Sequence, residues 1–223
     1  MKAPVAEIFS SIQGEGIFLG ARQIFVRFCG CNLKCSYCDE PASRAAGKMM
    51  TAERILREIS RLGKKPHHSV SLTGGEPLLH ADFIAALAPR IKTAGLPVYL
   101  ETNAALPEKF RLVSRHVDIV AADWKFRRST GEELAARHRD FLSQCRGRVF
   151  VKAVLTGGES RAELEQCAGT VADVSAHIPL VIQPATPVST QAVKTAEKFL
   201  KLARRKLARV IILPQQHPIW GVK

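Results

Sequence analysis

Short runs rich in β-branched and aromatic residues alternate along the chain with longer segments of helical periodicity. The expected strands cover residues 24–29, 68–72, 98–101, 117–122, 149–155, 180–183 and 210–213. Apolar side chains at three- and four-residue spacing predict helices over residues 52–62, 81–92, 132–142, 162–175 and 190–203. Such alternation indicates a parallel sheet, because a crossover helix returns the chain to the same end of the sheet. We therefore expect an α/β fold, a single-domain open or partial β/α barrel with its chemistry at the carboxyl ends of the strands.

The composition is consistent with one domain over residues 1–223. The apolar content of 46% is sufficient for a buried core. Residues 1–10 contain one lysine and no apolar stretch long enough for a signal peptide. No apolar run reaches the roughly 18 residues that a membrane span needs. We expect a cytoplasmic protein without a membrane partner.

The net charge of +13 raises the possibility of a nucleic-acid partner, because basic surfaces bind phosphate. Much of the excess lies late in the chain, at Lys194, Lys198, Lys201, Arg204, Arg205, Lys206 and Arg209. A solvated helix face explains these residues more simply. Because only 6% of the residues are aromatic and available for stacking on bases, we expect no nucleic-acid partner. A metal-stabilised nucleic-acid-binding module is kept as the non-enzymatic alternative.

The expected strand at residues 24–29 has one wholly apolar face, while its other face carries Arg27. A buried arginine is costly unless it is paired. We therefore expect Arg27 to point into the barrel and to meet a carboxylate of the protein or of a ligand.

Three cysteines follow this strand with the spacing Cys-x-x-x-Cys-x-x-Cys, at Cys31, Cys35 and Cys38. A closed zinc site needs a fourth ligand, and no neighbouring histidine supplies one. Three thiolates can instead hold a 4Fe-4S cluster whose fourth iron stays open to a ligand. Cys29, at the end of the strand, is interpreted as a small packed thiol.

This triplet, with Tyr37 before its third cysteine, resembles the signature of the radical S-adenosylmethionine enzymes. The stretch TGGEP at residues 73–77 is the matching second element, where glycines allow close backbone approach. The resemblance implies a 4Fe-4S cluster and S-adenosylmethionine as cofactors. In that family the open iron binds the amino and carboxylate groups of S-adenosylmethionine, and the reduced cluster cleaves it to a 5′-deoxyadenosyl radical.

Both ends of the chain narrow the resemblance to the 7-carboxy-7-deazaguanine synthase family. The residues that carry it are EIFSSIQGEGIFLGARQIFVRFCGCNLKCSYCD near the amino end, ETN at 101–103, QP at 183–184 and the closing LPQQHPIWGVK. It implies the ring contraction of 6-carboxy-5,6,7,8-tetrahydropterin with loss of ammonia, in queuosine (7-deazapurine) biosynthesis, with Mg²⁺ as a helper ion. Segments 1–23 and 208–223 are expected to complete the substrate pocket. A homodimer and a flavodoxin- or ferredoxin-type electron donor are also expected.

Carried over residue by residue, the resemblance implies two sets of binding residues and no catalytic acid or base. The substrate set is Ile12, Gln13, Gly14, Arg27, Thr73, Glu101, His217 and the terminal carboxylate of Lys223. The cofactor set is Tyr37, Cys38, Asp39, Gly75, Asp123, Trp124, Lys125, Gln183, Pro184, Ala185 and Thr186. Glu15, in QGEG, is either part of the pocket or only part of a turn.

The sequence departs from the family pattern at two places. Glu40 follows the cysteine motif where magnesium-dependent members carry threonine, so the Mg²⁺ site is altered, replaced by a direct carboxylate ligand or absent. The second departure is DWK at residues 123–125, where serine-proline-lysine is usual. An Asp-x-Lys pattern also resembles the glycyl-radical-enzyme activases. An activase that abstracts hydrogen from a glycine of a partner protein is therefore the enzymatic alternative.

Overall fold

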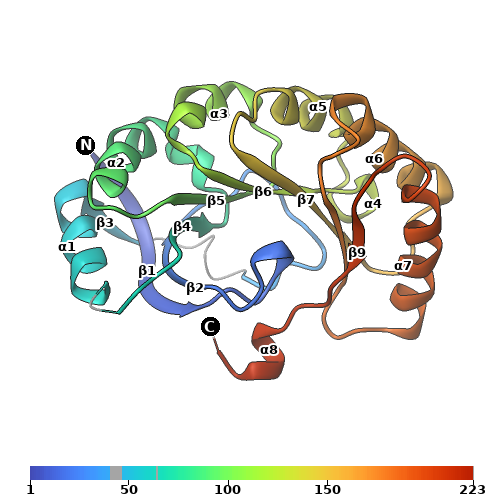
Figure 1. Cartoon of the computed structure of the whole chain (residues 1–223), viewed down its shortest axis with the longest axis horizontal. Coiled ribbons are helices and arrows are strands. Elements are labelled where there is room, and N and C mark those ends of the chain that lie inside the picture. The colour runs from blue at the N-terminus through green and yellow to red at the C-terminus, as the bar shows by residue number, and fades with distance from the viewer. Residues whose placement is uncertain (41–46, 64, 223) are drawn as a thin grey trace.

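The fold is an open β/α barrel. The structure is a computed structural model that describes residues 1–40, 47–63 and 65–222, and across them the strands form one sheet in the order β3-β1-β2-β4-β5-β6-β7-β8-β9. The strands β3 and β9 are the two edges and do not pair with each other, so the barrel is not closed. Figure 1 shows the sheet curving under an arc of helices that covers its outer side. The predicted fold class is confirmed.

Seven parallel strands make up most of the sheet, and each corresponds to one of the predicted strands. They are β2 (Arg22–Phe28), β4 (Ser69–Gly74), β5 (Val98–Thr102), β6 (Ile119–Trp124), β7 (Arg148–Leu155), β8 (Leu180–Pro184) and β9 (Val210–Ile212). All of their carboxyl ends therefore lie at the same end of the barrel, where a ligand site is expected.

Two further strands, which the sequence did not predict, extend the sheet beyond β2. Strand β1 (Lys2–Ile12) runs antiparallel to β2, with Phe9 opposite Phe25, and β3 (Lys48–Thr51) runs antiparallel to β1. Residues 7–12 of β1 are only partly buried, so this half of the strand lacks a strict apolar alternation. The segment expected only to complete the pocket is thus also part of the sheet.

The five predicted helices are present on the outer side of the sheet. They are α1 (Ala52–Leu62), α2 (Ala81–Thr93), α5 (Ala135–Ser143), α6 (Arg161–Val174) and α7 (Thr190–Ala203). Hydroxyl caps set where several begin: Thr51 accepts from the Arg54 amide before α1, and Ser160 forms a capping box with Glu163 before α6. Helix α5 begins three residues later than predicted. The charged residues from Lys194 to Arg209 are exposed, as expected for a solvated helix face.

Shorter helical segments, none of them predicted, connect the main elements. They are α3 (Pro107–Val113), α4 (Arg127–Thr130), α8 (His217–Trp220) and the 3₁₀ turns at Gly16–Phe18, Pro77–His80 and Ser114–His116. Within the described ranges, no helix combines the length and apolar character required to cross a bilayer.

The side chains on the inner face of the sheet change character along each strand. A small apolar cluster, to which Ile17 and Phe18 add, lies near the amino ends of the strands and consists of Tyr99, Ile119, Ala121, Phe150 and Val181. On three of these strands, the residue two positions after the apolar one lies on the same face and is polar. These residues are Glu101 on β5, Lys152 on β7 and Gln183 on β8. The barrel is therefore filled by apolar side chains at one end and lined by polar ones at the other.

Candidate active site

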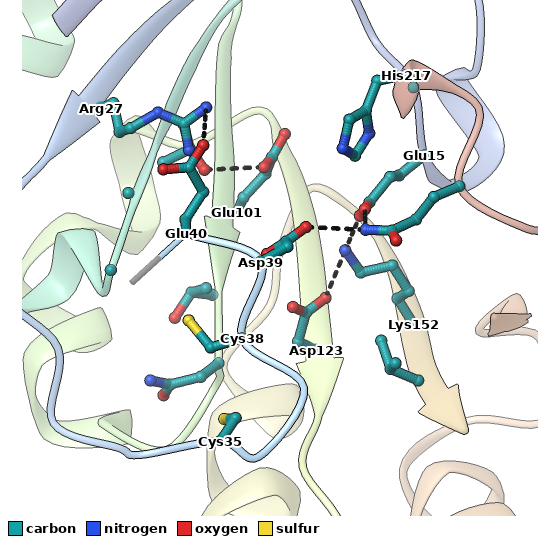
Figure 2. Close-up of a pocket in the computed structure, with 18 of the residues that line it drawn as sticks. Glu15, Arg27, Cys35, Cys38, Asp39, Glu40, Glu101, Asp123, Lys152 and His217 are labelled. Atoms are coloured by element: carbon teal, nitrogen blue, oxygen red, sulfur yellow. Dashed lines mark hydrogen bonds and ion pairs between the residues drawn. The ribbon is translucent and has the colours of Figure 1, made fainter. Parts of the chain in front are cut away.

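A cavity of about 320 Å³ opens among these polar side chains at the carboxyl ends of the strands. Segments far apart in the sequence line it: the end of β1, the cysteine loop, the ends of β4 to β8, and the segment after β9 (Figure 2). Its charged lining residues are Glu7, Glu15, Asp39, Glu40, Glu101, Asp123, Arg27, Lys125 and Lys152. Carboxylates thus outnumber the cationic side chains in a chain that is basic overall, which favours cationic ligands.

The cysteine loop enters the cavity directly from β2. Cys31, Cys35 and Cys38 all line the cavity, and Leu33 is buried beneath the loop against Ala105 and Leu134. Gathering three thiols at one wall fits the ligand set of an iron–sulfur cluster with an open iron. By contrast, Cys29 is buried and does not line the cavity, so its side chain agrees with a packed thiol.

Gly74 at the end of β4 and Gly75 directly after it allow the loop to lie close to the sheet. A Cβ on Gly75 would lie 2.1 Å from the Gly30 carbonyl oxygen, and one on Gly74, with φ of +135°, would lie 2.0 Å from the Phe28 oxygen. In addition, the Glu76 amide donates to Gly30 O over 2.8 Å. The close approach that requires glycine here is to the backbone at the start of the cysteine loop.

A buried carboxylate ties the neighbouring strand to the loop. Glu76 accepts hydrogen bonds from the amides of Leu78 (2.9 Å) and Asn103 (2.8 Å) and from the Thr102 hydroxyl (2.8 Å). The Asn103 side chain in turn donates to Asn32 Oδ1 over 2.8 Å. Burial raises the pKa of Glu76 to about 7. These contacts explain why GGEP and ETN occur together: both support the loop.

Arg27 lies on the cavity wall between two carboxylates, as Figure 2 shows for Glu40. Its Nε lies 3.1 Å from Glu7 Oε1, and its Nη2 lies 3.3 Å from Glu40 Oε1. The guanidinium also lies 5.6 Å from the centroid of the Phe9 ring, within cation–π distance. The sequence predicted an inward-pointing arginine paired with a carboxylate. In the structure, Arg27 is paired with two carboxylates, those of Glu7 and Glu40.

Glu101 lies deeper in the cavity, where three polar side chains donate to it. These donors are Gln13 Nε2 (2.7 Å), Ser71 Oγ (3.0 Å) and Thr73 Oγ1 (2.9 Å). Burial raises the pKa of Glu101, although the Lys152 ammonium acts in the opposite direction. The result is a fixed, partly buried acceptor suited to N–H donors of a ligand.

Glu15 takes part in a network on the opposite wall, so it is more than a turn residue. It forms an ion pair with Lys152, whose Nζ also lies 3.2 Å from Asp123 Oδ1. Burial alone would raise the pKa of Glu15, but the charge and hydrogen bond of Lys152, together with Gln215 and His217, outweigh it and lower the pKa to about 2. Gln215 donates to both Glu15 (2.5 Å) and Asp39 (2.9 Å), and thereby joins the carboxyl-terminal segment to the cysteine loop.

The segment around α8 closes over one side of the cavity. The amide of Gln216 donates to Gly14 O over 2.9 Å, and a Cβ on Gly14 would lie 2.6 Å from His217 Cβ. Glycine at position 14 is therefore required for this contact. His217 faces Glu15 in Figure 2, and ligand atoms of Glu15, Asp39 and His217 lie within 4.8 Å of one another.

The structure brings together most of the residues predicted to bind ligands. Lining the cavity are Ile12, Gln13, Gly14, Arg27, Thr73, Glu101, His217, Tyr37, Cys38, Asp39, Gly75, Asp123, Lys125, Gln183, Ala185 and Glu40. Trp124 instead faces the helices, 4.5 Å from the His138 ring, because side chains alternate along β6. Pro184 is buried, Thr186 is exposed, and neither lines the cavity. Lys223 lies outside the described residues.

Among the lining residues to which the sequence assigned no binding role are Glu7, Glu15, Lys152 and Gln215. Lys152 had a usable signal, since a lysine inside the apolar run VFVKAVL parallels the inward arginine of β2. The two acidic residues and Gln215 lie in segments without such a pattern. Their roles depend on contacts between the two ends of the chain.

The donors and acceptors of the cavity fit S-adenosylmethionine as well as the cluster. Gln183 lines the cavity, and its Oε1 is buried with no hydrogen-bond partner among the described residues. A buried acceptor without a partner favours a ligand that supplies an N–H or O–H group. The surplus of carboxylates also suits the positive charge of a sulfonium.

Comparisons with known proteins agree with this description of the site. Residues 25–165 match the family model of the radical SAM superfamily. The 7-carboxy-7-deazaguanine synthase of Geobacter sulfurreducens is 36% identical over 98% of this chain and 97% of the relative. The 7-carboxy-7-deazaguanine synthase of Methanothermobacter thermautotrophicus is also 36% identical, over 100% of this chain and 99% of the relative. The crystal structure of QueE from Escherichia coli has the same fold, with a TM-score of 0.66, 21% identity and coverage of 95% of this chain and 94% of that one.

An open β/α barrel with three cysteines at the carboxyl end of its first parallel strand is the arrangement of a radical SAM enzyme, and the chain belongs to that superfamily. Within the superfamily, the full-length similarity makes it a member of the 7-carboxy-7-deazaguanine synthase family.

Proposed function

We propose that this protein catalyses the radical ring contraction of 6-carboxy-5,6,7,8-tetrahydropterin to 7-carboxy-7-deazaguanine, with loss of ammonia. The observation that carries the proposal is the presence of a partly buried cation and a partly buried acceptor inside one cavity: Arg27 on the wall and Glu101 held by three donors. A carboxylated pterin has the complementary groups, an anion at one end and N–H donors at the other.

Arg27 would bind the carboxylate of the substrate. A guanidinium carries several N–H donors in one plane, and the bond to Glu7 through Nε fixes that plane. The substrate carboxylate would then take the Nη donors in a geometry that orients the pterin. Holding the substrate at this point determines which of its hydrogens faces the radical.

Glu101 would accept hydrogen bonds from the amino and amide N–H groups of the pterin ring. Gln13, Ser71 and Thr73 already donate to it, so the carboxylate is fixed before the substrate binds. Ile12, Gly14, His217 and the carboxylate of Lys223 complete the proposed substrate set. Because the segment carrying His217 contacts Gly14, the cavity suits a small molecule better than the glycine of a partner protein.

The cofactor set would hold S-adenosylmethionine beside the cysteine loop. Its proposed members are Tyr37, Cys38, Asp39, Gly75, Asp123, Lys125, Gln183 and Ala185, and it leaves out Trp124, Pro184 and Thr186, which do not line the cavity. When bound, the cluster and S-adenosylmethionine supply the 5′-deoxyadenosyl radical that abstracts hydrogen from the substrate. The protein's part is to bind and orient both molecules and to limit the access of water.

Glu40 is proposed as a direct ligand of Mg²⁺ in place of the threonine of other members. In the structure its carboxylate lies against Arg27, where the substrate carboxylate is expected. Glu7, Glu40 and the substrate carboxylate beside one guanidinium would leave a negative surplus, and a divalent cation between Glu40 and the substrate would offset it. Activity should therefore depend less on added Mg²⁺ in the wild type than in Glu40→Thr. Identical Mg²⁺ titrations of turnover would remove Glu40 from the metal site.

Two partner assignments complete the proposal. A flavodoxin- or ferredoxin-type protein is proposed as the electron donor, and a homodimer as the assembly. Analytical ultracentrifugation tests the second: a monomer at assay concentration would reject it.

The test of the function itself is anaerobic incubation of the reconstituted protein with the carboxytetrahydropterin, S-adenosylmethionine, Mg²⁺ and a reductant. We expect the mass of 7-carboxy-7-deazaguanine in the products, and none with Cys35→Ala. Release of 5′-deoxyadenosine without this product would reject the substrate while leaving the radical chemistry intact.

A further inference from the structure

A mostly buried lysine lies beside the cysteine loop. Lys125 follows β6, and its side chain is only 10% exposed. Its Nζ lies 5.3 Å from the centroid of the Tyr37 ring, and Tyr37 is the residue between Cys35 and Cys38 that directly precedes the third thiol. The loop that would hold the cluster therefore has a fixed positive charge next to it.

A carboxylate accompanies this lysine. Asp123 Oδ2 lies 3.1 Å from Lys125 Nζ, and Asp123 Oδ1 lies 3.2 Å from Lys152 Nζ. The carboxylate thus bridges two buried ammonium groups, and Lys152 holds it in place independently of Lys125. Both residues of the pair line the same cavity as Cys31, Cys35 and Cys38.

A reduced iron–sulfur cluster carries one more negative charge than the oxidised cluster, so nearby fixed charges alter its reduction potential. A buried cation stabilises the reduced form and moves the potential upward. A carboxylate at similar range destabilises it and moves the potential downward. Screening by water is weak here, because both side chains are mostly buried.

We propose that Lys125 and Asp123 form a charge pair that sets the reduction potential of the cluster held by Cys31, Cys35 and Cys38. Asp123 stands where the family resemblance leads us to expect serine, so the negative member of the pair is a feature of this chain. The carboxylate lowers the potential relative to a chain with a neutral residue at this position. The inference needs only the cluster and holds whatever the organic substrate is.

The test is a potentiometric titration of the reconstituted protein without S-adenosylmethionine, followed by electron paramagnetic resonance of the reduced cluster. Lys125→Met removes the cation at similar length, and Asp123→Asn removes the negative charge at the same size. We expect the midpoint potential to fall in Lys125→Met and to rise in Asp123→Asn. Each shift should correspond to at least a tenfold change in the one-electron equilibrium, which is about 59 mV.

Two controls accompany these variants. Lys125→Arg keeps the charge and should stay close to the wild-type potential, as should Lys201→Met, which removes an exposed lysine on α7. Shifts in the same direction for Lys125→Met and Asp123→Asn, or no shift in either, would overturn the proposal. If Lys125→Met does not retain the cluster, the sign of the shift in Asp123→Asn decides: an unchanged or lower potential rejects the pair.

Discussion

Replacing Arg27 by lysine keeps the positive charge of the cavity wall but removes the planar guanidinium. In the structure, Nε lies 3.1 Å from Glu7 and Nη2 lies 3.3 Å from Glu40, in a side chain that is 14% exposed. A single ammonium cannot keep the contact with Glu7 and also present two parallel donors to a substrate carboxylate. The variant should therefore lose a charged hydrogen bond to the substrate.

The expected size follows from that contact. A hydrogen bond to a charged group contributes about 1.5–3 kcal/mol. Since each 1.36 kcal/mol is a factor of ten in rate, product formation should fall by about 10- to 100-fold. Cluster content and cofactor binding should not change, because Arg27 is neither a cluster ligand nor a member of the proposed cofactor set.

The assay compares product formation with 5′-deoxyadenosine release, side by side, in the wild type and Arg27→Lys. We expect product to fall while uncoupled cleavage of S-adenosylmethionine persists. Arg22→Lys is the matched control, since Arg22 lies on the same strand and is exposed. If Arg27→Lys forms product as fast as the wild type, Arg27 is only a structural partner of Glu7 and Glu40, and the reasoning is refuted.

Three further outcomes are expected. Alanine at Cys31, Cys35 or Cys38 should abolish the brown colour and the bound iron, whereas Cys29→Ala should keep both; full iron content in one of the first three would contradict the ligand assignment. Lys152→Met leaves Glu15 and Asp123, only 16% and 22% exposed, without their shared ammonium. It should cost about 3–5 kcal/mol of stability in urea unfolding, and unchanged stability would show that the ion pairs contribute little. Because Lys152, together with Gln215 and His217, lowers the pKa of Glu15 from 4.5 to about 2, the stability from these contacts should be complete above pH 4.5 and lost as the pH falls towards 2. Thermal unfolding across this range should show a shallower acid limb in Glu15→Gln than in the wild type, and parallel curves would exclude the linkage.

The parallel part of the fold could be predicted from the sequence because its strands are buried on both sides and its helices are amphipathic. The apolar runs at β4 to β8 leave few alternatives to a parallel sheet. Strand β1 lacked this signal, since a half-buried strand with serines at positions 10 and 11 has no strict alternation. Its pairing with β2 depends on tertiary contacts that no local pattern records.

The site was predictable where chemistry restricts the choice of residue. Three clustered cysteines and an arginine within an apolar strand have few structural explanations, so both indicated the cavity. The network of Glu15, Lys152 and Gln215 could not be found in this way, because its members come from the two ends of the chain and the middle of β7. Trp124 was assigned to the site although it does not line it. The segment 123–125 was assigned as a whole from the family resemblance, but side chains alternate along β6, so that Trp124 faces the helices instead of the cavity.

The central claim is that the cysteine loop and the Arg27 wall serve one reaction, the ring contraction of a carboxylated pterin. The most direct measurement is ammonia released per molecule of 7-carboxy-7-deazaguanine during anaerobic turnover of the reconstituted wild-type protein. We predict equal amounts of the two, and neither from Cys35→Ala. Cleavage of S-adenosylmethionine with no ammonia and no deazaguanine, or activation of a glycyl-radical protein instead, would contradict the claim.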